Sequence, residues 1–178
     1  TGMTSSVLLH NAVALGVDLQ RLDHVVISHG HPDHYGGLEG LLRKHQAPLP
    51  VSIHDEAFSP RYLRLSTGEV APYYNADLTP ARLIAAGGNL ALHRDPLEIG
   101  PGIIATGEIP RKRSFEAPST DLSAPNALIQ IRDSRVEADV VPDDQALVIN
   151  IGNDGIIVLV GCSHAGVINS IEYAQQIT

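Results

Sequence analysis

The chain has 178 residues, 43% of them hydrophobic and 18% charged, a length and composition that suit one folded domain over residues 1–178 and exclude a disordered chain. Its formal net charge of −8 argues against a surface that binds nucleic acid through bulk charge. One cysteine excludes an internal disulfide and a four-cysteine zinc site, whereas 9 histidines raise the question of a metal.

The first half of the chain alternates between helix and strand signals. Apolar spacing, proline and glycine predict a helix at 5–17, a strand at 24–28, a loop at 29–37, a helix at 38–44 and a strand at 51–54. Ser5 or Ser6 is the expected N-cap of the first helix. Residues 55–82 contain several prolines and are predicted to be irregular, with little helix.

The second half continues the alternation. It is predicted to contain strands at 90–93, 103–106 and 128–131, a loop at 110–126, a hairpin formed by 146–151 and 156–160, and a helix at 167–176. Asp154 and Gly155 are expected to supply the positive-φ residues of the hairpin turn. Because strands and helices interleave, the fold class is α/β.

Three histidines and an aspartate lie within six residues, directly after the strand at 24–28. Neutral imidazole and carboxylate are ligands that suit zinc, iron or manganese. In a loop that leaves a strand, His29 and His31 can share one metal, while Asp33 and His34 reach a second. The alternatives are an ordinary surface loop and a closed structural zinc site.

A second segment with possible ligands, Cys162-Ser163-His164, follows another apolar strand. Layered α/β folds gather their sites where strands end, so we expect His164 to complete the metal cluster. The alternative is a histidine buried in the core. Cys162 is interpreted as a small buried residue in preference to a thiolate ligand.

The segment around residues 106–113 also follows a strand. Glu108 is either a metal ligand, or a partner that orients a histidine, or an ordinary loop carboxylate. Arg111 and Arg113 belong to the densest basic cluster of the chain, which either binds an anionic substrate group or forms a solvated face. Asp143 or Asp144 lies either beside the site or in a simple turn.

These residue types predict a hydrolase. Two metal ions would make a metal-bound hydroxide available near neutral pH for attack on an ester, lactone or phosphoester. Asp33 would ligate one ion and accept a hydrogen bond from the hydroxide. Tyr35 or His54 would donate to the substrate or leaving group, with a structural role as the favoured alternative for His54. We expect a cytoplasmic protein whose substrate is a small molecule, for which an anionic compound is one candidate. We expect neither nucleic acid nor a membrane as a partner. The oligomeric state is left unassigned.

The segment His29–His34, with Gly36 and Gly37 behind it, resembles the H-x-H-x-D-H signature of the metallo-β-lactamase fold superfamily. Segments 106–111, 115–116, 143–147 and 161–166 resemble the subgroup of dihydropterin-ribofuranosylaminobenzene phosphate synthase-like metal-dependent hydrolases. The resemblance spans residues 1–178. It implies a four-layer αβ/βα sandwich with a dinuclear metal site at one sheet edge. In that pattern His29 and His31 hold one metal, Asp33 and His34 hold the other, and His164 joins the cluster.

The resemblance also sets expectations about the ends of the chain and about alternatives. The family pattern starts with strands before an Asp-Thr-Gly segment and ends with a strand bearing a further histidine, so we expect a domain incomplete at both termini. The cofactors implied are two divalent ions, with zinc favoured over iron or manganese. The alternatives to a hydrolase are a pterin-linked transferase, in which Arg111 and Arg113 bind phosphate, and a non-catalytic metal-binding sensor domain.

Overall fold

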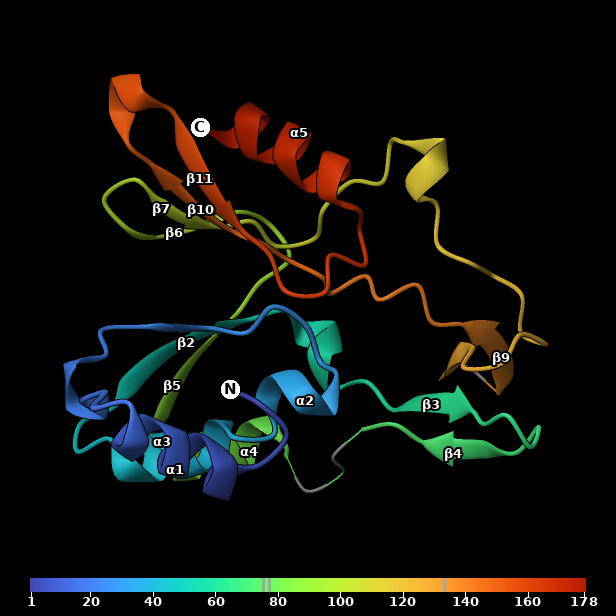
Figure 1. Cartoon of the computed structure of the whole chain (residues 1–178), viewed down its shortest axis with the longest axis horizontal. Helices are drawn as coiled ribbons and strands as arrows, with labels where there is room; N and C mark the ends of the chain where they lie inside the picture. Colours follow the sequence, from blue (N-terminus) through green and yellow to red (C-terminus); the bar gives the residue numbers. More distant parts are fainter. Residues whose placement is uncertain (75, 77, 133) are drawn as a thin grey trace.

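Two sheets face each other between layers of helices in the computed structural model, which describes residues 1–74, 76, 78–132 and 134–178 (Figure 1). The first sheet is parallel and has the order β1-β2-β5. Its strands are β1 (Val25–Val26), β2 (Leu49–Ile53) and β5 (Gly88–Leu92). Its outer face carries α1 (Ser5–Ala14), α3 (Leu38–Lys44) and α4 (Pro80–Ala85).

The second sheet is antiparallel, in the order β11-β10-β7-β6. Its strands are β6 (Leu97–Gly100), β7 (Ile103–Ala105), β10 (Leu147–Asn150) and β11 (Ile156–Leu159). Helix α5 (Val167–Ile177) covers its outer face in Figure 1. The layers therefore run helix, sheet, sheet, helix, which confirms the expected four-layer αβ/βα sandwich.

The larger hydrophobic core lies between the parallel sheet and its helices. Strand β2 contributes Leu49, Val51 and Ile53, each no more than 1% exposed, as expected for a central parallel strand covered on both faces. On α3, Leu38, Leu41 and Leu42 are buried on one face, because residues three and four apart share a side of a helix. This core fixes the position of β1, from which the histidine segment leaves.

A third sheet stands to one side and corrects the prediction that residues 55–82 are irregular (Figure 1). It has the order β4-β3-β8-β9, with strands β3 (Arg61–Arg64), β4 (Val70–Pro72), β8 (Leu128–Arg132) and β9 (Arg135–Ala138). The apolar pattern failed here because β3 begins and ends with arginine and buries the first of them, Arg61. Pro80 does not interrupt a helix but lies in the first turn of α4. Its missing N–H has no hydrogen-bond partner within the helix at that position, so no helical hydrogen bond is lost.

Smaller corrections concern element ends and one turn. Thr4, not Ser5 or Ser6, caps α1, and the helix ends at Ala14. The β10–β11 turn takes its positive φ values at Gly152 (66°) and Gly155 (106°), whereas Asp154 belongs to a short 3-10 helix. Strands β6 and β9 were missed, and the loop at 29–37 contains the short helix α2 (Pro32–Tyr35).

The remaining single turns are 3-10 helices, at Leu19–Arg21, Asp55–Phe58, Ser114–Glu116 and Gly152–Asp154. In the part of the chain that the structure describes, no helix is both long and apolar enough to cross a membrane.

Candidate metal centre

Four histidines from two segments converge at α2. His29, His31 and His34 come from the segment after β1, and His164 comes from the loop between β11 and α5. Their ring centroids lie 4.0 Å apart for His29 and His34, 4.6 Å for His29 and His31, 4.8 Å for His29 and His164, and 4.9 Å for His31 and His164. His29 and His31 thus meet His164, more than 130 positions later in the sequence, as the two motifs led us to expect.

His29, His31 and His164 form a first donor group, whose ligand atoms all lie within 4.8 Å of one another. His29 is fully buried and His31 is 4% exposed. The Nε2 atoms of His31 and His164 are buried without a hydrogen-bond partner, and unpaired buried polar atoms are costly. A divalent cation coordinated by this group would satisfy these nitrogens, so the donor set fits a metal of the zinc type.

The protonation of this group also suits a metal. Burial, followed by the charges of the neighbouring histidines and of Arg61, lowers the pKa of His29 to about 2 and that of His31 to about 3. Burial likewise lowers the pKa of His34 and of His164. At neutral pH these imidazoles are therefore uncharged, and each has a nitrogen lone pair available for coordination.

We expect the metal-free protein to lose stability as the pH falls below about 6.5. Unfolded histidine has a pKa near ~6.5, whereas folded His29 and His31 resist protonation down to about 2 and about 3. Their contribution to the free energy of unfolding is complete above pH ~6.5 and is lost as the pH falls toward those values. Two such groups predict a loss of up to about 4 kcal/mol between pH ~6.5 and ~5, measurable by urea unfolding. An equal loss in the His29→Gln/His31→Gln double variant would contradict this.

His29, His34 and Cys162 form a second donor group, again within 4.8 Å of one another. The Nε2 atom of His34 lies 3.2 Å from the sulfur of Cys162 and 3.5 Å from the Oδ2 atom of Asp33. The hydroxyl of Ser28 lies 3.1 Å from Nδ1 of His34 and 3.2 Å from Nδ1 of His29, which fixes both rings. Cys162 is exposed, so its interpretation as a small buried residue was wrong.

His54 and Glu108 form a separate pair near the end of β2. His54 is fully buried, and its Nδ1 accepts the backbone N–H of Glu56 at 3.1 Å. Its Nε2 has no hydrogen-bond partner and lies 4.0 Å from the Oε2 atom of Glu108. Burial is the main reason why the pKa of His54 is lowered. Glu108 thus faces His54 and belongs to neither donor group, and its role as a ligand stays a prediction.

The tyrosine near the histidines is not the one we expected. Tyr35 is 3% exposed and belongs to the hydrophobic core, which leaves it poorly placed to reach a substrate. The ring of Tyr73 lies 5.1 Å from that of His31, centroid to centroid. Burial, and then the charge of Asp33, raise the pKa of Tyr73, which also hydrogen-bonds that carboxylate. Sequence reasoning missed Tyr73 because it follows β4, in the segment predicted to be irregular.

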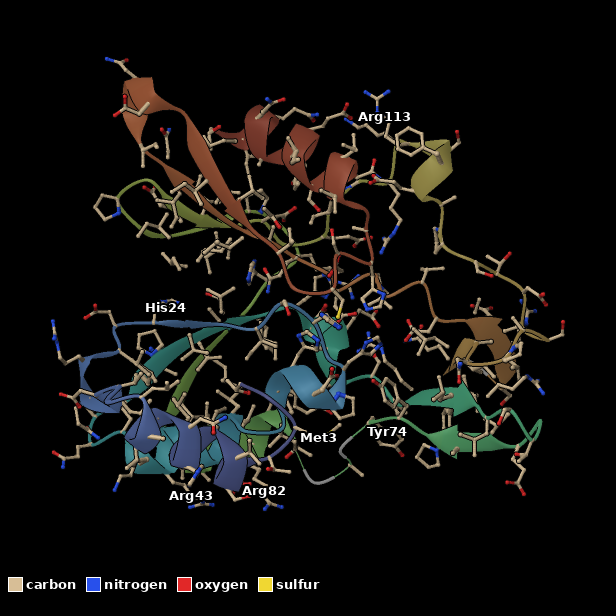
Figure 2. All side chains as sticks on the ribbon, in the orientation of Figure 1. Met3, His24, Arg43, Tyr74, Arg82 and Arg113 are labelled. Atoms are coloured by element: carbon tan, nitrogen blue, oxygen red, sulfur yellow. The ribbon has the colours of Figure 1, made fainter. Side chains whose placement is uncertain are left out.

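The two arginines predicted to bind an anion already have partners in the protein. The Nη2 atom of Arg111 donates to the carbonyls of Val140 and Val141 at 2.7 and 2.8 Å. Arg113 forms an ion pair with Glu172 of α5 and points outward from the molecule in Figure 2. Their predicted role in binding an anionic group stays a prediction, and for Arg113 the exposed ion pair accords with the alternative of a solvated face.

Two aspartates before β10 support the loops that carry the ligands. Asp143 accepts the backbone N–H of Gly30 at 2.6 Å, and Asp144 accepts that of Ala165 at 2.7 Å. The other oxygen of Asp144 has no hydrogen-bond partner and lies 3.9 Å from Nδ1 of His29. Burial raises the pKa of Asp144 to about 6 despite the hydrogen bond from Ala165. The sequence had left open whether these residues form a simple turn.

A cavity of about 260 Å³ borders the cluster at His164. Its walls come from the loop between residues 118 and 128 and from the segment 138–141. The lining residues that the structure describes include neither lysine nor arginine. This cavity offers a space in which part of a small molecule can lie beside the first donor group.

Comparison with known proteins agrees with this geometry. The sequence model of the metallo-beta-lactamase superfamily matches residues 1–173. Tm1679, a protein described as a metal-dependent hydrolase of the beta-lactamase superfamily, has a similar structure with a TM-score of 0.73. Its sequence is 24% identical, and the match covers 100% of this chain and 60% of Tm1679.

Two curated relatives come from Methanocaldococcus jannaschii. The first, 30% identical over 173 residues, is named 7,8-dihydropterin-6-methyl-4-(beta-D-ribofuranosyl)-aminobenzene-5'-phosphate synthase, and the match covers 96% of this chain and 56% of the relative. The second, uncharacterized protein MJ0448, is 27% identical over 174 residues, with 98% of this chain and 60% of the relative covered. The chain thus spans little more than half the length of either. Its match to the family model over residues 1–173 shows that the chain belongs to the metallo-beta-lactamase superfamily.

Proposed function

We propose that this chain is the metal-binding part of a hydrolase that uses two divalent ions, zinc being the favoured metal. The observation that carries the proposal is the first donor group, in which His29, His31 and His164 are neutral, close together and partly without hydrogen-bond partners. A surface loop has no reason to bury two such rings in contact with a third. Membership of the superfamily points to the same chemistry.

The second ion of this proposal would be held by Asp33, His34 and Cys162. The carboxylate and the sulfur both lie within 3.5 Å of Nε2 of His34, which supports a shared ligand position. Carboxylate, imidazole and thiolate are all ligands of zinc. Relative to the set expected from the sequence, this assignment adds Cys162 and leaves Glu108 outside.

The metal ions would supply Lewis acidity, activating a water molecule and polarising the carbonyl or phosphoryl oxygen under attack. The chain's own residues would direct the proton. Asp33 is 46% exposed on its side chain and so open to an incoming substrate, and its carboxylate can accept a proton or a hydrogen bond. Tyr73 stays protonated at neutral pH because its pKa is raised, so its hydroxyl can donate to the substrate when it turns away from Asp33. The substrate would be a small molecule with one part in the cavity beside His164.

A transferase is the second candidate, and the name of the 30% identical relative favours it, since that protein is a synthase of a pterin-linked aminobenzene phosphate. It would require a site for phosphate. The absence of lysine and arginine from the described lining of the cavity gives no support for a phosphate there. Product formation that depends on both a pterin and an aromatic ribosyl phosphate would favour the transferase over the hydrolase.

The test of the proposed function is metal content together with turnover. We expect elemental analysis to find about two zinc ions per chain in the wild type, and fewer in the Cys162→Ser variant, which loses a ligand of the second ion. Chelation should abolish the hydrolysis of ester, lactone or phosphodiester substrates, and zinc should restore it. Metal without any turnover would favour a sensor domain, and a wild type free of metal would contradict the proposal.

A further inference from the structure

A buried ionic network lies behind the first donor group. Arg61 of β3 is fully buried, and its Nε donates to Oδ2 of Asp139 at 2.7 Å. Its Nη2 donates to Oδ1 of Asp143, and neither carboxylate side chain is exposed. The Nη1 atom of Arg61 has no hydrogen-bond partner, so the guanidinium is held through Nε and Nη2. Removing one partner of such a buried pair is strongly destabilising, because it leaves a buried charge without compensation.

This network reaches the backbone between two of the metal-binding histidines. The second oxygen of Asp143 accepts the N–H of Gly30, which stands between His29 and His31, at 2.6 Å. Gly30 is packed so closely that a Cβ atom there would lie 2.0 Å from the carbonyl oxygen of Ala57 and 2.5 Å from Nη1 of Arg61. The backbone of the histidine segment is therefore packed directly against Ala57 and Arg61 at Gly30, and a larger residue does not fit there.

The residues after Asp143 hold the other loops of the site. Asp144 accepts the N–H of Ala165, the residue after His164. Gln145 donates its backbone N–H to the carbonyl of Ser28 at 2.9 Å, and its side-chain amide to the carbonyl of Ile27 at 2.8 Å. In Figure 1 this orange segment runs from β9 to β10 and passes the red loop that precedes α5.

The start of this segment is held in an unusual conformation. Val141 has a φ of 53°, a left-handed backbone that is unfavourable for a β-branched residue. Asp139 accepts its N–H at 2.9 Å, and Arg111 donates to its carbonyl at 2.8 Å. Such strain persists only where the surroundings determine the conformation, which indicates that residues 139–145 are held rigidly.

We propose that Asp143, held by Arg61, is a positioning residue of the metal centre. It fixes the backbone at Gly30 so that the nitrogens of His29 and His31 converge before any metal arrives. The network thereby links the third sheet, through Arg61 on β3, to the histidine segment after β1. This inference rests on the proposed function, because it assigns to Asp143 a part in metal binding.

Asp139 offers a matched control, since it pairs with the same guanidinium. In the part of the chain that the structure describes, the side-chain hydrogen bonds of Asp139 go to Arg61 and Val141 and not to the histidine segment. Asp139→Ala and Asp143→Ala each remove one buried carboxylate from Arg61, so both should lower the stability of the metal-free protein. Only Asp143→Ala also releases Gly30.

The experiment measures the zinc dissociation constant of both variants by competition with a chelator, and the stability of the metal-free proteins by urea unfolding. Asp143→Ala should weaken zinc binding about 10–100-fold more than Asp139→Ala at a similar loss of stability. Equal zinc affinities would overturn the proposal. If an alanine variant does not fold, Asp143→Asn and Asp139→Asn replace the pair. The neutral amide offers one oxygen in place of two, so the same order of affinities is expected, and equality again overturns it.

Zinc binding by the wild type separates a failure of the positioning role from a failure of the proposed function. If the wild type binds zinc and the two variants bind it equally, only the positioning role of Asp143 is lost. If the wild type binds no zinc, the proposed function and the positioning role fall together.

Discussion

Replacing His31 by alanine should lower metal-dependent turnover by about 10³-fold. His31 is 4% exposed and offers a buried nitrogen to the first donor group, so its loss removes a ligand that no other described residue of that group replaces. The electrostatic stabilisation that a metal supplies amounts to several kcal/mol, and each ~1.4 kcal/mol corresponds to a factor of ten. The measurement is kcat/KM on the best substrate of the turnover screen, at saturating zinc.

The matched control is His10→Ala. His10 lies exposed on α1, away from both donor groups, and its replacement should leave kcat/KM within about twofold of the wild type. If His31→Ala also stays within that range, the histidine cluster is not the catalytic centre. Loss of folding in His31→Ala is recognised by its urea unfolding curve in the metal-free state.

Arg61→Met should cost about 3–5 kcal/mol of unfolding free energy. The substitution leaves the carboxylates of Asp139 and Asp143 buried, close together and without their cation. A methionine fills much of the volume of the arginine, so the loss comes mainly from uncompensated charge and less from a cavity. Urea unfolding of the metal-free protein at neutral pH measures the effect.

Arg82→Met is the control for removing an arginine that has an ionic partner. Arg82 pairs with Glu39 at 2.8 Å, but its side chain is 46% exposed and lies at the surface in Figure 2. Exposed pairs of this kind contribute ~0–1 kcal/mol. A second comparison removes the two carboxylate charges that lose their cation. Asp139→Asn and Asp143→Asn in the Arg61→Met background should recover part of the lost unfolding free energy. Equal costs for Arg61→Met and Arg82→Met would contradict the buried network.

The sequence predicted those parts of the site in which several metal-binding residues lie close together in one short segment. His29, His31 and His34 stand within six residues after a β-branched run, so their proximity follows from local chain geometry. His164 follows a second apolar strand and meets them because both strands end at the same side of the sandwich. The helix–sheet alternation likewise follows from apolar periodicity.

The parts that the sequence did not reveal depend on contacts between distant segments. Arg61 reads as a surface residue of an irregular stretch, and only its pairing with Asp139 and Asp143, 78 and 82 residues later, explains its burial. Tyr73 reaches His31 because β4 pairs with β3 at the side of the sandwich. Cys162 lies on the open side of the cluster, and no pattern of neighbouring residues distinguishes that position from a buried one.

The most direct test of the metal centre is a crystal structure of the zinc-loaded protein with anomalous diffraction collected on both sides of the zinc absorption edge. We predict an anomalous peak in contact with His29, His31 and His164, and a second in contact with Asp33, His34 and Cys162. The absence of any peak at His29, His31 and His164 in fully loaded crystals would contradict the central claim that these histidines form a metal site.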